Sequence, residues 1–160
     1  MRHILFLLLA GFGAGCHYTS NPVPVVVMPD SLYTLTDKGY ELVWDMSSNA
    51  GVTLCGRNDT PVIFLSPRFV NHPAEGLILA HEREHVRQLN THKGGCRKGL
   101  LDYTTNPDTR GRWEAEAHCA SISYARVFQP EALGYLENMK REMIARERIT
   151  NPMTLQILQC

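Results

Sequence analysis

The stretch Ile78-Leu79-Ala80-His81-Glu82-Arg83-Glu84-His85-Val86 contains the pattern H-E-x-x-H inside a run that is typical of a helix. Residues four apart lie on one face of an α-helix, so the imidazoles of His81 and His85 can both reach one metal ion. Glu82 can lie beside that ion without binding it. The pattern therefore predicts Zn²⁺ held by the two histidines, with Glu82 as a general base toward water. The alternative is an exposed charged helix in which two histidines fall four residues apart by accident.

The helix that carries this motif is predicted to begin near residues 71 to 73 and to run to about Asn90. Its inward face is a stripe formed by Leu77, Ile78, His81, His85 and Leu89. The glycines at 94 and 95 are expected to end the helix. A polar loop is predicted to follow as far as residues 107 and 108, and it can lie over a cleft.

The segments on either side predict an α+β fold. Short β-prone runs before the motif predict a small sheet of three or four strands, expected as a meander. Their residues are Tyr33 to Leu35, Tyr40 to Trp44, Val52 to Cys55 and Pro61 to Leu65. After the motif, helices are predicted over about 108–128 and about 131–149. One domain over residues 31–160 is long enough to form a core.

The N-terminal residues are typical of a secretory leader. A positive start, an apolar stretch of about a dozen residues and small residues predict a signal peptide over residues 1–15. Gly13-Ala14-Gly15-Cys16 resembles a bacterial lipobox, although Gly13 replaces the usual large aliphatic residue. Cleavage before Cys16 would leave a lipid-modified N-terminus, and plain cleavage after Ala14 or Gly15 is the alternative. Residues 16–30 are expected to form an extended tether, although residues 23–27 could instead add an edge strand.

The predicted export would place the other cysteines in an oxidising compartment, where disulfides form. Cys55, Cys96, Cys119 and Cys160 form an even set, which predicts two disulfides in an oxidising compartment. Three pairings are possible, and the absence of a C-x-x-C pair disfavours metal binding by these thiols. The 16 basic and 16 acidic side chains give a formal net charge of zero. This balance argues against nucleic acid as a partner.

A catalytic zinc ion usually has three protein ligands, so a third ligand must lie downstream. His92 comes seven residues after His85 without an intervening glycine, which does not match the long metzincin motif. The downstream run Trp113-Glu114-Ala115-Glu116-Ala117-His118 is the better candidate. Together with H-E-x-x-H, it resembles the E-x-x-A-D motif of the gluzincins, in particular their minimal membrane-protease types. The resemblance covers only residues 62 to 128, and His118 stands where the family has an aspartate.

The resemblance implies a zincin-like fold in which Glu114 is the third zinc ligand and Ala117 lets two helices pack closely. It also implies that the strand over residues 62–65 could pair with an extended substrate. Helical geometry agrees with the choice of Glu114, because Glu114 and Glu116 lie about 200° apart and only one can face the metal. The alternative is that both are surface carboxylates on an alanine-rich helix.

His118 is predicted to lie beside the site, one turn after Glu114. It could orient a ligand histidine, stabilise an oxyanion or lie on the helix surface. Tyr103 and Tyr124 are weaker candidates for the oxyanion role.

These features predict an exported zinc metallopeptidase of the cell envelope or periplasm, anchored to the membrane by lipid at Cys16 and acting on a peptide or protein. In a second interpretation, the chain is an envelope lipoprotein that binds or assembles, with zinc structural or absent. In a third, the same chemistry acts on another amide, such as one in the cell wall.

Overall fold

The computed structural model describes residues 23–27, 33–37, 40–44, 49–146 and 149–160. The predicted leader, Cys16 and most of the predicted tether lie outside this part of the chain. Five strands are described, with bounds β1 Val25–Val27, β2 Tyr33–Asp37, β3 Tyr40–Trp44, β4 Gly51–Cys55 and β5 Pro61–Leu65. The described α-helices are α1 Glu75–Thr91, α2 Gly95–Thr105, α3 Pro107–Phe128, α4 Leu133–Arg146 and α5 Pro152–Ile157.

The larger sheet has three strands in the order β1-β5-β4. β5 lies in the middle, where Ile63 is opposite Val25 of β1 and Thr53 of β4. Pro61, Ile63 and Leu65 are buried while the residues between them are half-buried, which is the period of two expected when one face of a strand packs on a core. The centre of the sheet is therefore fixed by β5.

The predicted meander is wrong. β1 runs parallel to β5, whereas β4 runs antiparallel to it, and β2 and β3 form a separate antiparallel pair. The alternative that residues 23–27 add an edge strand is confirmed, since Val25–Val27 pairs with Ile63–Leu65. The central position of β5 also corrects the expectation that residues 62–65 could pair with a substrate, because both edges of β5 are already occupied.

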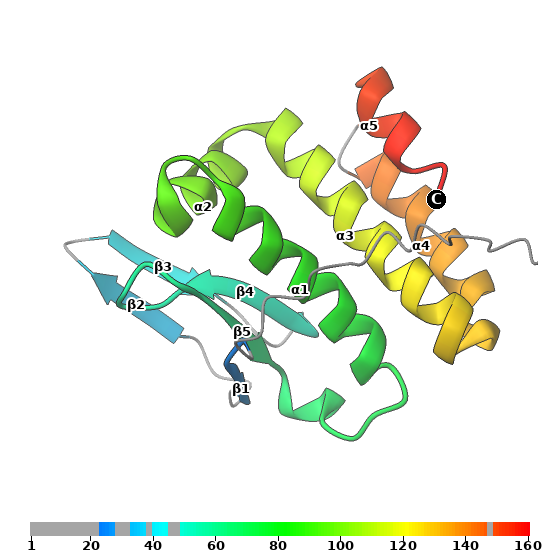
Figure 1. Ribbon diagram of the computed structural model, residues 1–160, viewed down its shortest axis with the longest axis horizontal. Helices are drawn as coiled ribbons and strands as arrows, with labels where there is room; N and C mark the ends of the chain where they lie inside the picture. The colour runs from blue at the N-terminus through cyan, green and yellow to red at the C-terminus, as the bar shows by residue number, and fades with distance from the viewer. Residues whose placement is uncertain (1–22, 28–32, 38–39, 45–48, 147–148) are drawn as a thin grey trace, which may run out of the picture.

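The helices form layers on one face of this sheet (Figure 1). α1 packs against β4 and β5 on one side and against α3 on the other, and α4 and α5 contact the far side of α3. Ala117 and Ala125 are fully buried on α3, and Ala125 packs in one cluster with Leu77 of α1. On α1, Gly76 has no room for a side chain because the Tyr124 ring of α3 lies against it. Small residues thus bring the two helices together, and α1 occupies the centre of the molecule.

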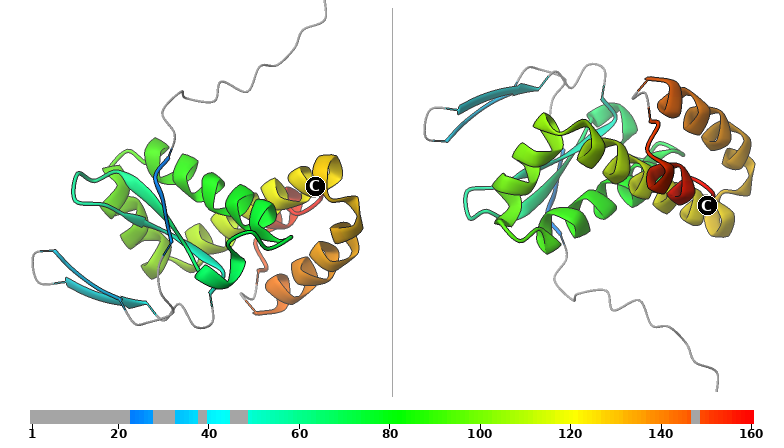
Figure 2. Two further views of the ribbon diagram at one scale, coloured as in Figure 1. Left: turned by 90° about the horizontal axis from the view of Figure 1, so that it is seen from below. Right: turned by 90° about the horizontal axis from the view of Figure 1, so that it is seen from above.

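The predicted loop over residues 94–107 is wrong, because α2 occupies Gly95–Thr105, nearly all of it. Cys96, Leu100 and Tyr103 recur at helical spacing and pack with Leu89 and Trp113 in one hydrophobic cluster. Asn106 then ends α2 and caps α3, since its side chain accepts from the backbone N–H groups of residues 108 and 109. The two views in Figure 2 show α2 beside the sheet, at the same end as the start of α3.

Two disulfides are present, as predicted, and the pairing is Cys55–Cys96 and Cys119–Cys160. The first joins β4 to α2, and the second joins α3 to the end of the chain. The predicted helices over about 108–128 and about 131–149 correspond to α3 and α4. α5 was not predicted. In the part of the chain that is described, no helix has the length and apolar character needed to cross a membrane.

Candidate metal centre

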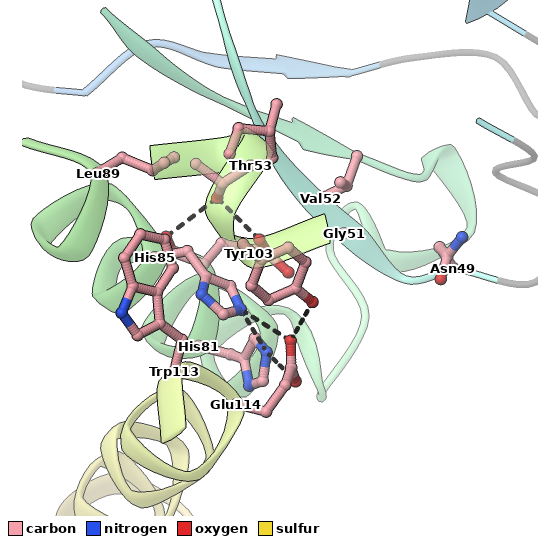
Figure 3. A pocket seen from close by; sticks show the side chains of 12 residues that line it. Asn49, Gly51, Val52, Thr53, His81, His85, Leu89, Tyr103, Trp113 and Glu114 are labelled. Atoms are coloured by element: carbon pink, nitrogen blue, oxygen red, sulfur yellow. Dashed lines mark hydrogen bonds and ion pairs between the residues drawn. The ribbon is translucent and has the colours of Figure 1, made fainter. Parts of the chain in front are cut away.

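The three predicted ligands meet between α1 and α3. The Nε2 atoms of His81 and His85 lie 3.1 Å apart on one face of α1. Glu114 reaches them from α3, with Oε2 3.5 Å from His81 Nε2 and Oε1 3.4 Å from His85 Nε2 (Figure 3). These ligand atoms all lie within 4.8 Å of one another. The structure thus brings together two nitrogens and a carboxylate that are 29 to 33 residues apart in the chain.

This spacing fits a zinc ion. With bonds of about 2.0–2.1 Å to nitrogen and oxygen, a tetrahedral zinc ion holds its ligand atoms roughly 3.3–3.4 Å apart. The three observed separations, from 3.1 to 3.5 Å, are close to this value, with the two nitrogen–oxygen distances ending on different oxygens of Glu114. Two imidazoles and one carboxylate are also a donor set typical of catalytic zinc. Metal binding itself stays a prediction.

The charges around the three groups favour a cation. Burial alone lowers the pKa of His85, but the hydrogen bond and negative charge of Glu114, together with Glu82, raise it to about 9. Burial raises the pKa of Glu114, whereas the hydrogen bonds and charges of His81 and His85 hold it well below its usual range. The carboxylate therefore attracts positive charge to this point. A metal ion that binds here displaces protons from the imidazoles.

Gln88 orients the ring of His85. The Gln88 Oε1 atom lies 2.8 Å from His85 Nδ1, and Gln88 Nε2 donates to the backbone oxygen of Trp113 and to Glu116 Oε2. Because its NH₂ group is already used, the Gln88 oxygen must accept from His85 Nδ1–H. Nε2 of His85 then carries the lone pair that can bind a metal ion. The sequence analysis missed Gln88, although its spacing of three from His85 and seven from His81 places it on the same helix face.

Glu116 does not face the two histidines. Its carboxylate pairs with Arg87 and accepts from Gln88, so it lies on the outer side of the network around His85. This placement agrees with the helical argument that only one of the two carboxylates, Glu114, can face the metal.

Glu82 lies beside the ligands without joining them. Its side chain is buried and lines the same pocket, and its Oε2 atom accepts a hydrogen bond of 2.8 Å from Thr53 of β4. Gly51 of β4 lies so close that a β-carbon there would be 3.1 Å from Glu82 Cγ and 3.3 Å from Oε1. Strand β4 therefore fixes the position of Glu82, and the glycine gives its carboxylate room.

Tyr103 of α2 is the aromatic residue that reaches the ligands. Its hydroxyl donates to Glu114 Oε1 at 2.5 Å, and its ring stacks on Trp113 and meets the His85 ring edge-on. Tyr124, by contrast, packs against Phe128 and the core beneath the far end of α1, and it does not line the pocket. Of the two tyrosines weighed from the sequence, the structure places Tyr103 at the site.

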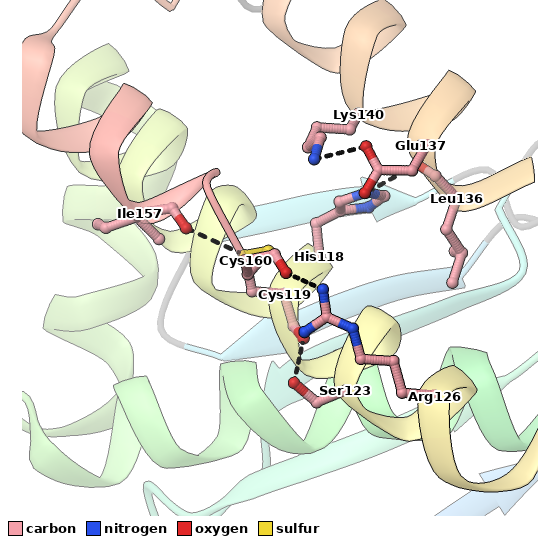
Figure 4. Close-up of a disulfide and its surroundings, with 9 residues drawn as sticks. All are labelled: His118, Cys119, Ser123, Arg126, Leu136, Glu137, Lys140, Ile157 and Cys160. Carbon is pink, nitrogen blue, oxygen red and sulfur yellow. Dashed lines mark hydrogen bonds and ion pairs between the residues drawn. A yellow bond between two sulfur atoms is a disulfide. The ribbon is translucent and has the colours of Figure 1, made fainter. Parts of the chain in front are cut away.

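His118 lies outside the pocket, although it is one turn after Glu114. Its side chain is buried, and Nε2 donates to the backbone oxygen of Leu136 on α4 at 2.9 Å (Figure 4). The alternative of a position on the helix surface is therefore wrong. With Nε2 occupied by α4, the ring connects α3 to α4, and nothing in the structure supports the predicted contact with substrate.

The cysteines are not available as metal ligands, because their sulfurs form disulfides. Cys55 and Cys96 lie close to Asp59, in a cluster that could hold an ion if the thiols were free. Both sulfurs are used in the disulfide, so that cluster offers only a carboxylate. Among the described residues, the group formed by His81, His85 and Glu114 is the remaining one with three available ligands.

Comparison of the chain with models of protein families, with curated proteins and with solved structures finds no match. The arguments for function therefore come from the chain itself.

Proposed function

We propose that this chain is a zinc-dependent hydrolase of peptide bonds. The observation that carries the proposal is the meeting of His81 Nε2, His85 Nε2 and the Glu114 carboxylate, 3.1 to 3.5 Å apart, in a pocket that also contains Glu82. When bound, zinc would lower the pKa of a water molecule toward about 7 and polarise the scissile carbonyl.

The role proposed for Glu82 is proton transfer. Thr53 donates to Oε2, which leaves Oε1 as the atom that accepts a proton from the attacking water. Glu82 would then deliver this proton to the leaving amine nitrogen as the carbon–nitrogen bond breaks. The hydrogen bond from Thr53 keeps the carboxylate in one orientation through both transfers.

An extended peptide suits the wall of the pocket. Asn49, Gly51, Val52 and Thr53 line it, and they lie in or next to β4. Among the described strands, β4 pairs only with β5, so the backbone groups of its outer edge remain for a bound chain. Pairing of that edge with an extended segment is a common way to bind peptides. This edge favours a peptide over the alternative of another amide, such as one in the cell wall.

The number of ligands favours catalysis over a purely structural zinc ion. Structural zinc sites are closed by four protein ligands, whereas catalytic sites have three and keep one position open. In the described part of the chain, three suitable groups converge here. This is the argument against an envelope-assembly or binding module with structural zinc.

Zinc content and a single substitution test the proposal. The full chain, purified from an oxidising compartment, should contain one zinc ion per molecule and cleave members of a peptide library. Glu82→Gln should keep the zinc and lose cleavage by at least about 100-fold, because it cannot take up the proton. Glu84→Gln is the matched control, since Glu84 lies on the same helix but pairs with Arg87.

A folded wild-type protein without affinity for zinc would overturn the proposal. Undiminished cleavage by zinc-loaded Glu82→Gln would overturn the role of Glu82. Stoichiometric zinc without cleavage of any peptide would instead support the binding module, and cleavage of cell-wall fragments alone would support the third interpretation.

We also infer that the chain is exported and held at the membrane by lipid at Cys16. The two disulfides are compatible with export. The inference of lipid attachment is supported by the lipobox-like sequence alone. Metabolic labelling with a radioactive fatty acid, compared between the wild type and Cys16→Ser, tests this inference.

A further inference from the structure

We propose that Tyr103 positions the Glu114 carboxylate for the metal, and that the Cys55–Cys96 disulfide holds Tyr103 in place. Reduction of this one disulfide to two thiols by an external dithiol, which is itself oxidised to a disulfide, would therefore weaken metal binding at His81, His85 and Glu114. The inference rests on the proposed zinc centre and adds a redox condition to it. It proposes a function for α2, the helix that occupies the predicted loop.

The first step is the contact between Tyr103 and Glu114. The carboxylate is about 15% exposed, and its Oε1 atom accepts from the Tyr103 hydroxyl while both oxygens face the imidazoles. The ring of Tyr103 cannot turn freely, because it lies between Trp113, on which it stacks, and His85. Hydrogen bonds of this kind fix a ligand carboxylate, and removing one typically costs about 10- to 100-fold in metal affinity.

The second step is the attachment of α2. The helix lines the pocket through Leu100 and Tyr103, and β4 lines another part of it. The first turn of α2 is joined to the end of β4 by the Cys55–Cys96 disulfide. Beside it, Arg97 donates from its backbone to Asp59 Oδ1 and from its side chain to the backbone oxygen of Arg57. The covalent link thus connects these two elements.

The third step is the geometry between the disulfide and the tyrosine. Cys96 and Tyr103 are seven residues apart on α2, which places them on the same helix face, with Leu100 between them. All three side chains pack in the cluster around Leu89 and Trp113. A shift at the first turn of the helix is therefore carried to the hydroxyl two turns later. A further contact, from His92 Nε2 to Asp102, remains after reduction, but Asp102 is about 41% exposed and such pairs hold weakly.

The second disulfide provides a matched control. Both disulfides join residues separated by 41 positions, so their removal relaxes loops of equal length in the unfolded chain. Cys119–Cys160 lies on the side of α3 near α5 and the end of the chain (Figure 4). Any effect of general loosening should appear equally in both disulfide variants.

The experiment measures zinc affinity by competition with a chromophoric chelator, using the full chain with its disulfides formed. We expect Tyr103→Phe, which keeps the ring but lacks the hydroxyl, to bind zinc about 10- to 100-fold more weakly than the wild type. The pair Cys55→Ala/Cys96→Ala should weaken binding to a similar degree. The pair Cys119→Ala/Cys160→Ala should bind like the wild type. Adding Tyr103→Phe to the first pair should change the affinity less than twofold, because the contact is already lost.

Several results would overturn the inference. One is wild-type affinity in Tyr103→Phe, a variant that retains the packing of the ring and so tests the contact even if the cysteine variants fail to fold. Another is an equal loss of affinity in the two disulfide pairs. If the wild type itself does not bind zinc, the proposed function fails together with the inference, whereas normal zinc binding by the wild type with no effect of Tyr103→Phe overturns the inference alone.

Discussion

Glu114 and Glu116 point in different directions because α3 turns by about 200° between them. Glu114 faces the imidazoles of His81 and His85, while Glu116 pairs with Arg87 on the outer side. The same rotation applies on α1, where His81 and His85 share a face and Arg83 is exposed. At the scale of single residues, the helical period decides which side chains face the candidate metal centre, more than their chemical type does.

Acid should destabilise the fold through His118. Burial lowers the pKa of His118 from its ordinary value of 6.5, the hydrogen bond to Leu136 opposes this, and the charges of His81 and Lys140 lower it further. The unfolded chain therefore binds this proton more tightly than the folded chain does. The contribution of His118 is complete above the unfolded pKa and is lost as the pH falls below it. We expect the free energy of unfolding to fall less steeply from about pH 7 to about pH 5 in His118→Gln than in the wild type.

Urea denaturation at a series of pH values, with chelator present to remove any metal, measures these slopes. His118→Gln should also lose about 1 kcal/mol at neutral pH, because the bond to the Leu136 oxygen is remade less well. Equal slopes in the wild type and His118→Gln would contradict the prediction.

The sequence predicts the centre better than its surroundings. His81, Glu82 and His85 follow from spacing along one helix, which is a local property of the chain. Glu114 follows from the resemblance to the gluzincin motif, and helical geometry agrees with it over Glu116. Tyr103 and Gln88 could be found only in part, since each acts through a contact set by how α1, α2 and α3 pack. The predicted position of His118 beside the site is wrong, because its partner lies on α4, a helix whose position no local pattern predicts.

At the scale of elements, the rate of the proposed peptide cleavage should depend on the distance between β4 and α1. A β-carbon at Gly51 would lie 2.9 Å from Ile78 Cγ2 and 3.1 Å from Glu82 Cγ. Gly51→Ala should therefore push β4 and the Glu82 carboxylate apart. We expect peptide cleavage to fall by about 10- to 100-fold while zinc is retained, because small displacements of a catalytic group are costly. Steady-state kinetics with zinc analysis of the same samples measures both.

Gly134→Ala is the control for this substitution. Nothing lies within 4 Å of a β-carbon at Gly134 on α4, so this change should leave cleavage unaltered. It should stabilise the protein by up to about 1 kcal/mol, since alanine favours a helix over glycine. A Gly51→Ala protein that cleaves at the wild-type rate would show that β4 does not constrain Glu82.

Helix α2 shows where prediction of elements fails. Three glycines and several polar residues between 93 and 107 are typical of a loop, and they outweigh the short apolar repeat at Cys96, Leu100 and Tyr103. That repeat becomes decisive only when Leu89 and Trp113 are present to pack against it. The parallel pairing of β1 with β5 fails for a similar reason, because the direction of a strand depends on the connection and not on its composition.

At the scale of the whole molecule, the two disulfides join different pairs of elements. Cys55–Cys96 joins the sheet to α2, and Cys119–Cys160 joins α3 to the chain end beside α5. An even number of cysteines was enough to predict two bonds, but pairing over 41 residues required the packed fold. Between the two bonds, α1 and α3 are joined by packing and, in our proposal, by zinc.

Zinc should therefore stabilise the entire fold. Its proposed ligands come from α1 and α3, the two helices at the centre of the layers, and unfolding would separate them. At a free zinc concentration about 1,000 times the dissociation constant, the free energy of unfolding should rise by about 4 kcal/mol. Scanning calorimetry with and without zinc measures this rise. Glu114→Gln should remove most of it, whereas Glu116→Gln should retain it, because the Glu116 carboxylate pairs with Arg87. An equal response in both variants would mean that zinc binds elsewhere, since one helix cannot present both carboxylates to one ion.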